Sequence, residues 1–290
     1  MYSAPALEKG LDIIELLACE ATGLTQVVIA QRLERSPTEI FRMLSVLERR
    51  GYLNRHPDGS YRLSLRLFEL AHQHPPLQRL LNVALPAMQE LTQITRQSTH
   101  LVIHFANRIL VVAQVDSPEP MGFGVRLGAN FPFRPDRVSS CVLSAFQPES
   151  VQEELIAALL QDGSDRAKAT QVRATLADIQ DKGFYMAQSD TVSGVTDLCA
   201  PVFDHSDVAI AALTVPYLAQ RDVSVTITQV QAALLEPPGR FQRDWVRRRI
   251  GARRVGVRQA WCSCRTSFTL AITRYYCFDF GPSLIHVKYF

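Results

Sequence analysis

The chain has 290 residues, of which 47% are hydrophobic and 20% are charged, a composition typical of globular proteins that excludes a disordered chain. Two domains are expected, because a single hydrophobic core stops growing at roughly 250–300 residues. The longest uncharged apolar stretch, residues 208–220, is shorter than the roughly 20 residues of a membrane-spanning helix, and the first residues lack the continuous hydrophobic region of a secretory signal. We therefore expect a cytoplasmic protein with no membrane contact.

The charges and the cysteines are unevenly distributed. The net charge of +3 combines 11 basic and 2 acidic residues in 237–290 with 20 basic and 26 acidic residues in 1–236. Six cysteines at irregular spacing do not form the framework of a disulfide-rich protein, so reduced thiols are expected. We expect no cofactor.

Residues 1–63 predict a winged helix-turn-helix domain, which consists of three helices and a β-hairpin. Helical periodicity marks the first two helices, and Thr25 is a suitable cap for the second. The runs 52–55 and 60–63 flank an Asp-Gly turn, which is a strong hairpin signal. A connecting helix is expected in the linker, residues 64–76.

The third helix has the clearest start signal in the chain. Ser36 can cap it, Pro37 suits the first helical position, and Glu39 can reach back to the Ser36 amide. Its apolar periodicity turns Thr38, Phe41, Arg42, Ser45 and Arg49 toward solvent.

This exposed face is the candidate DNA-binding surface. Residues 32–66 contain eight arginines and four acidic residues, a balance that favours phosphate contact, although a solvated helix face has the same charge pattern. Arg42 could pair with a guanine and Phe41 could contact a thymine methyl, while the hairpin tip would follow the DNA backbone or the minor groove. The candidate DNA-binding residues are Ser36, Pro37, Thr38, Phe41, Arg42, Ser45, Arg49, Arg55 and Arg62.

Residues 77–236 predict an α+β domain of the ligand-sensing type. Helices are expected at 77–95, 138–146, 151–161, 171–182 and 223–235, and strands at 99–105, 109–115, 184–187, 200–204 and 208–215. The segment 121–136 is rich in Gly and Pro. A cysteine-dependent hydrolase, with Cys141 or Cys199 beside His104 and Asp116, is a different interpretation, but no spacing supports it.

Motifs in both halves resemble the isocitrate lyase regulator (IclR) family of bacterial transcriptional regulators over residues 4–236. The segments that carry the resemblance are 6–11, 29–33, 42–44, 47–53, 61–63, 111–115, 194–197 and 200–204. The resemblance implies a winged helix-turn-helix joined by a linker helix to a GAF-like α+β effector-binding domain. It also implies a sequence-specific regulator, not an enzyme, that acts as a homodimer or a dimer of dimers on operator DNA and responds to a small organic acid.

The resemblance also implies an effector pocket, formed by Ser139, Ser140, Asp197, Cys199 and Thr214. Two departures from the family pattern bear on function. Glu34 replaces the usual Gly of the helix-turn-helix turn, which would be strained if the residue is left-handed. Residues 133–141 replace the small-residue entry to the helix that lines the pocket, so a DNA-binding regulator with a defective pocket is an alternative.

The basic tail, residues 237–290, matches nothing in the family. Out-of-frame translation and an evolved basic arm are both interpretations of it. Cys262, Cys264, Cys277 and His286 are zinc-type ligands, but their spacing does not fit a structural zinc site, and no metal is expected.

Overall fold

A computed structural model describes residues 4–134, 137–161, 166–204, 206–221 and 225–235. The tail, with its zinc-type ligands, lies outside the described residues. The chain divides into two compact units between Gln78 and Arg79. No helix among the described residues is long and apolar enough to cross a membrane.

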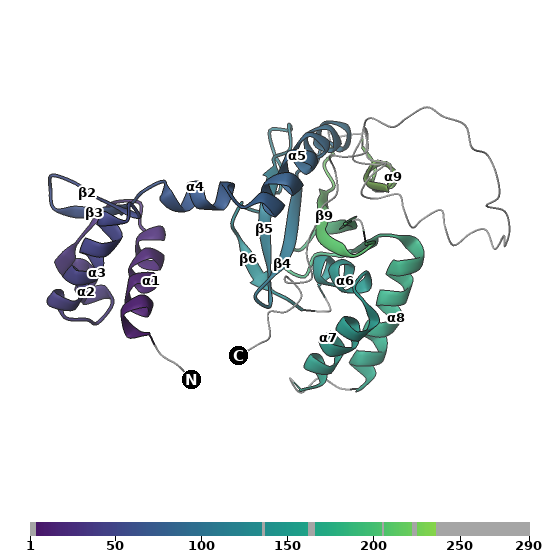
Figure 1. Ribbon diagram of the computed structural model, residues 1–290. Coiled ribbons are helices and arrows are strands. Elements are labelled where there is room, and N and C mark those ends of the chain that lie inside the picture. Colours follow the sequence, from purple (N-terminus) through teal and green to yellow (C-terminus); the bar gives the residue numbers. More distant parts are fainter. Residues whose placement is uncertain (1–3, 135–136, 162–165, 205, 222–224, 236–290) are drawn as a thin grey trace, which may run out of the picture. The chain divides into compact units, whose positions relative to one another are not determined.

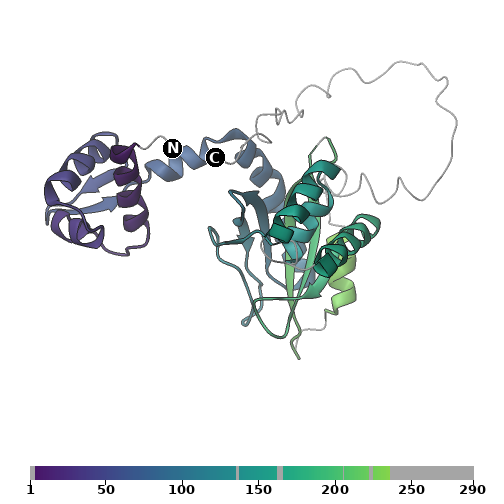
Figure 2. The ribbon, with the colours of Figure 1, turned by 90° about the horizontal axis from the view of Figure 1, so that it is seen from below.

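In the first unit three helices, α1 to α3, pack with a small antiparallel sheet, and a fourth, α4, follows the last strand (Figures 1 and 2). Its elements are α1 (Pro5–Ala18), β1 (Leu24–Thr25), α2 (Gln26–Arg32), α3 (Pro37–Arg49), β2 (Leu53–Arg55), β3 (Ser60–Leu63) and α4 (Arg66–His72). The strand order is β1-β3-β2. The core contains Ile13, Leu17, Ile29, Ala30, Ile40, Leu44, Leu53 and Tyr61. The expected winged helix-turn-helix is confirmed.

The two predicted helix caps have different outcomes. Ser36 and Glu39 form the expected capping box: the Ser36 hydroxyl accepts from the Glu39 amide at 3.3 Å, and Glu39 Oε2 accepts from the Ser36 amide at 3.3 Å. Thr25 occupies the N-cap position of α2, but its side chain makes no capping hydrogen bond, so that prediction was wrong in its chemistry. Thr25 belongs to the two-residue strand β1, where it pairs with Ser60.

The second unit is built on a six-stranded antiparallel sheet with strand order β6-β5-β4-β9-β8-β7. The strands are β4 (Thr99–Phe105), β5 (Arg108–Val115), β6 (Asn130–Pro132), β7 (Tyr185–Gln188), β8 (Val195–Phe203) and β9 (Ala209–Leu218). The helices are α5 (Pro75–Thr95), which starts in the first unit, α6 (Val138–Ala145), α7 (Glu149–Gln161), α8 (Arg166–Lys182) and α9 (Ile227–Leu235).

The two faces of this sheet pack against different helices (Figure 1). On β4, Thr99 faces α5, because its hydroxyl lies 3.0 Å from that of Thr92 in a buried contact. Val102 points to the opposite face and shares a hydrophobic cluster with residues of α6. Since side chains alternate along a strand, His100 and His104 share the α6 face with Val102.

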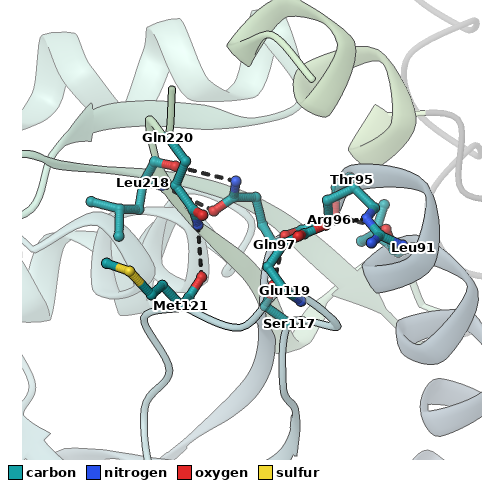
Figure 3. A network of polar contacts seen from close by, with 9 residues as sticks. All are labelled: Leu91, Thr95, Arg96, Gln97, Ser117, Glu119, Met121, Leu218 and Gln220. Atoms are coloured by element: carbon teal, nitrogen blue, oxygen red, sulfur yellow. Dashed lines mark hydrogen bonds and ion pairs between the residues drawn. The ribbon is translucent and has the colours of Figure 1, made fainter. Parts of the chain in front are cut away.

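A polar network ties one end of the sheet to the loop after β5 (Figure 3). The Gln97 side chain donates to the Leu218 carbonyl at 3.3 Å and accepts from the Leu218 amide at 3.0 Å. Arg96 pairs with Glu119 at 2.5 Å, and Gln220 donates to the Met121 carbonyl at 2.8 Å. The loop is therefore held both to the start of β4 and to the end of β9.

Several elements differ from the sequence prediction by a few residues, α9 for example beginning at Ile227 and not at 223, and three of them show why. β6 lies in the Gly- and Pro-rich segment that predicted no strand, where Asn130 to Pro132 pair with the edge of β5. β8 begins at Val195, five residues before the predicted start, because its first residues pair with β7 and β9 although they include Thr196 and Asp197. α8 begins at Arg166, ahead of the apolar periodicity that marked its predicted start.

Candidate DNA-binding face and effector site

The exposed face of α3 has the residues that the sequence predicted for it. Ile40 and Leu44 are buried, and Phe41 is 52% exposed although it is a large apolar side chain. The other predicted residues on this face are exposed as well: Thr38, Arg42, Ser45 and Arg49. An exposed phenylalanine among polar groups is suited to contact with a partner.

The arginines of the first unit fall into two groups. Arg32, Arg35 and Arg66 form ion pairs with carboxylates of the same unit, at 2.8 Å to Glu20, 3.9 Å to Asp12 and 2.8 Å to Glu69. A second group forms no ion pair with any described residue, namely Arg42, Arg49, Arg50, Arg55 and Arg62, and these residues lie on or next to α3, β2 and β3. Arg55 lies 5.8 Å from the ring centre of Tyr61, and Arg62 is close enough to Asp58 to help lower the pKa of its carboxyl. Among the described residues, the arginines of this unit without ion pairs therefore coincide with the predicted DNA-binding elements.

Two predicted DNA-binding hydroxyls are already engaged in the protein. The Ser36 hydroxyl belongs to the capping box of α3. Ser45 Oγ donates to the Phe41 carbonyl at 2.9 Å, one turn back along the helix. Each oxygen can still accept a hydrogen bond, but neither is a free donor to a phosphate.

The second site lies between α6 and the sheet, where three of the predicted effector residues meet. Cys199 on β8 and Thr214 on β9 face each other in register. Thr214 Oγ1 lies 3.2 Å from Cys199 Sγ and 3.4 Å from Ser139 Oγ of α6. All three side chains are buried, so they form a polar contact within an otherwise apolar layer.

The two remaining predicted residues have different environments. Ser140 is buried, and its hydroxyl accepts from the Arg134 amide at 3.3 Å, which ties the segment before α6 to the helix. Asp197 is two residues before Cys199 on β8, and so on the same face. Burial raises the pKa of its carboxyl, partly offset by a hydrogen bond from Ser189. A half-buried acid with a raised pKa is typical of binding sites.

Arg137, at the N-cap position of α6, was not predicted as a site residue. Its guanidinium contacts one oxygen of Asp190, with Nε at 3.1 Å and Nη2 at 3.0 Å, and lies 5.0 Å from the ring centre of Phe131. Its side chain is only 16% exposed. The start of α6 therefore combines a half-buried cation with amides that the helix itself leaves without acceptors.

His100 is a second residue that the sequence analysis missed. It is 7% exposed, pairs with Thr214 across β4 and β9, and has a buried Nδ1 without a hydrogen-bond partner among the described residues. Burial lowers the pKa of its imidazole to about 4, so the ring is neutral at physiological pH. The alternation along β4 places His100 on the same face as Val102 and was the one signal in the sequence, whereas the pairing with Thr214 is visible only in the structure.

The geometry disfavours a cysteine-dependent reaction. Burial raises the pKa of the Cys199 thiol to about 12, whereas a nucleophilic cysteine requires a lowered pKa. Cys141 is buried in the hydrophobic cluster between α6 and the sheet. Within the described part of the chain, no group of three or more potential ligands could hold a metal ion.

Curated proteins similar to this chain are regulators of transcription. The regulator XynR of Escherichia coli K12 is 24% identical over 220 residues, which is 74% of this chain and 87% of XynR. KdgR of the same organism is 23% identical over 219 residues, 74% of this chain and 82% of KdgR.

Solved structures with the same fold are also known. An IclR homologue from Microbacterium hydrocarbonoxydans, in complex with 4-hydroxybenzoate, gives a TM-score of 0.64 at 24% identity, over 79% of this chain and 95% of the other. The Thermotoga maritima IclR gives 0.63 at 18% identity, over 79% and 93%. At these identities the likeness establishes the fold.

Two family models match the chain directly. The IclR helix-turn-helix domain matches residues 6–57, and the model described as "Bacterial transcriptional regulator IclR C-terminal" matches residues 77–237. Together they cover both units and agree with the winged helix and the α+β domain. The chain therefore belongs to the IclR family of bacterial transcriptional regulators, with an N-terminal DNA-binding domain and a C-terminal effector-binding domain.

Proposed function

We propose that α3 and the β2–β3 hairpin read operator DNA and that a small organic acid bound between α6 and the sheet controls this binding. In this proposal residues 1–63 are the DNA-binding domain, 64–76 the linker and 77–236 the effector-binding domain. The observation that carries the DNA proposal is the set of five arginines without ion pairs on or next to α3, β2 and β3. Binding should weaken steeply with salt, because each phosphate contact releases counterions.

Two features at the start of α6 support an organic acid as the effector. The helix N-terminus favours an anion, and Arg137, held in place by Asp190, brings a guanidinium to the same end of the helix. Ser139 and Thr214 add hydroxyls deeper in the layer. The similar structure from Microbacterium hydrocarbonoxydans, a complex with 4-hydroxybenzoate, is consistent with an acid.

The test of this part is a titration of small carboxylic acids against the operator-bound protein. An operator is first selected from random DNA, and each acid is then added while binding is followed by fluorescence anisotropy. An acid that changes the affinity for DNA supports the proposal. If no acid changes it, the chain binds DNA constitutively, as expected for a defective pocket.

We further propose that the protein is a homodimer in which α4 pairs with its counterpart. Leu65, which precedes α4, is 80% exposed and Phe68 is 61% exposed, and Leu67 and Leu70 of the same helix are exposed as well, so the apolar exposure is concentrated in one helix. A two-fold dimer would match a nearly palindromic operator. Sedimentation at micromolar concentration tests this: a monomer contradicts it, and a tetramer indicates a dimer of dimers.

A further inference from the structure

His100 belongs to a row of side chains that crosses five strands of the sheet. The register pairs it with Gln114 of β5 on one side and with Thr214 of β9 on the other, and Thr214 in turn pairs with Cys199, which faces Tyr185 of β7. Residues paired across neighbouring strands point to the same face. Since Thr214 contacts Ser139 of α6, the whole row faces that helix.

The partners of this row leave one polar atom unexplained. Gln114 is satisfied, because its amide donates to Asp116 at 2.5 Å and accepts from the Leu127 amide at 3.0 Å. Thr214 has the contacts to Cys199 and Ser139 described above. His100 Nδ1 is buried without a hydrogen-bond partner in the described part of the chain. In a native interior such an atom takes a partner, either an ordered water or a bound molecule.

The charge state of His100 limits what that partner can be. With a pKa of about 4 the imidazole is neutral, so it can donate one hydrogen bond and accept one, but it cannot form an ion pair. The positive groups of the site, which are Arg137 and the free amides of the helix start, lie at the N-terminal end of α6. The two ends of the site therefore differ in the chemistry they favour.

We propose that His100 contacts the effector and makes the site selective for acids that also carry an uncharged oxygen, either a hydroxyl or a carbonyl. This inference rests on the proposed binding of an organic acid at α6. The carboxylate would lie at the start of α6, and the second oxygen would hydrogen-bond to His100. An acid that lacks this oxygen would leave the buried Nδ1 without a hydrogen bond from the acid, which weakens its binding.

The test compares matched pairs of acids on the full chain. Calorimetry is run with 4-hydroxybenzoate against benzoate, and with lactate and pyruvate against propionate. In the wild type, at least one oxygenated acid should bind about three- to tenfold more tightly than its plain partner, which is the effect of one hydrogen bond. In His100→Leu the two members of that pair should bind equally, and His100→Gln should restore part of the preference.

His104→Leu is the matched control. His104 lies on the same face of the same strand, but its ring stacks on Phe133 at 4.2 Å, away from Thr214 and Cys199. The control should keep the preference for oxygenated acids. In addition, the ¹⁵N chemical shift of His100 Nδ1 should move on addition of the oxygenated acid and stay unchanged with its plain partner.

The experiment distinguishes a failure of the proposed role of His100 from a failure of the proposed acid binding at α6. If plain and oxygenated acids bind the wild type equally, or if His100→Leu keeps the preference, the role of His100 is wrong while acid binding stands. If none of these acids binds, both proposals are wrong. If His100→Leu loses all acids equally, the substitution has damaged the site, and the wild-type protein then decides. A His100 Nδ1 shift that does not move when the more tightly bound oxygenated acid is added to the wild type would refute the inference.

Discussion

Replacing Arg42 by alanine should remove the preference for one base of the operator. Arg42 is exposed on the early part of α3 and forms no ion pair with a described residue, so no protein contact has to be broken before it reaches DNA. A bidentate contact between arginine and guanine contributes about 1–3 kcal/mol of discrimination, which is roughly 5- to 150-fold in affinity. The loss should be confined to the operator variants that keep that base.

Arg62→Ala should behave differently, because Arg62 lies on β3 of the wing. If it contacts phosphate, its removal weakens binding to all sequences alike and reduces the slope of log affinity against log salt by about one. Arg32→Ala is the matched control. Arg32 already pairs with Glu20 at 2.8 Å, and its loss should leave both affinity and salt slope close to those of the wild type.

The assay is fluorescence anisotropy with the selected operator and with each of its single-base variants, at four salt concentrations. Circular dichroism verifies that each variant is folded. The same uniform loss for Arg42→Ala and Arg62→Ala would refute base readout by Arg42. Equal effects of all three substitutions would refute the distinction between paired and unpaired arginines.

Three further predictions follow from the caps, the buried histidine and the tail. Ser36→Ala should destabilise the first unit by about 1 kcal/mol, the usual value of an N-cap, as measured by hydrogen exchange of α3 amides. The free energy of unfolding of the wild type should fall as the pH drops from about 6.5 toward 4, because the unfolded chain then binds a proton at His100 that the folded chain excludes. In urea unfolding at a series of pH values, His100→Leu should lack the part of this fall that His100 causes. Truncation after Leu235 removes the basic tail and should reduce only the salt-sensitive, non-specific part of DNA affinity, whereas loss of cooperative unfolding would mean that the tail is part of the fold.

The sequence predicted best those features that depend on neighbours in the chain. The capping box at Ser36, the exposed side chains of α3 and the Asp-Gly hairpin all follow from local chemistry that acts within four residues. The facing of Cys199 and Thr214 came from the family resemblance, and the register of β8 and β9 agrees with it.

Features set by distant contacts were missed. The strand β6 exists because the Gly- and Pro-rich segment returns to the edge of β5, and no periodicity over three residues could show this. His104 was named as a catalytic candidate and His100 was not, because the burial of His100 depends on the helix packed over the strand. Arg137 became a site residue only through Asp190, which is 53 residues away in the chain.

Glu34 and Gly51 each follow a helix of the first unit, so the free-energy cost of a left-handed residue can be tested at two positions. Both residues follow a helix and have a positive φ, 53° for Glu34 and 78° for Gly51. Both helix ends form the same pair of hydrogen bonds: the Glu34 and Arg35 amides donate to the carbonyls of Gln31 and Ala30, and the amides of Gly51 and the next residue donate in the same pattern after α3. Glu34 is therefore left-handed, which is the condition under which the sequence analysis expected a strained turn.

A side chain in the left-handed region costs about 1 kcal/mol relative to glycine. Glu34→Gly should thus stabilise the unit by up to about 1 kcal/mol, reduced by the greater freedom of glycine in the unfolded chain. Gly51→Ala should destabilise it by a similar amount, and since a Cβ at Gly51 would meet no atom within 4 Å, the change reports backbone strain without a clash. Glu34→Ala separates strain from side-chain contacts, because it keeps the Cβ. Hydrogen exchange of α2 and α3 amides measures all three variants, and a Glu34→Gly protein no more stable than Glu34→Ala would show that this turn has no strain to release.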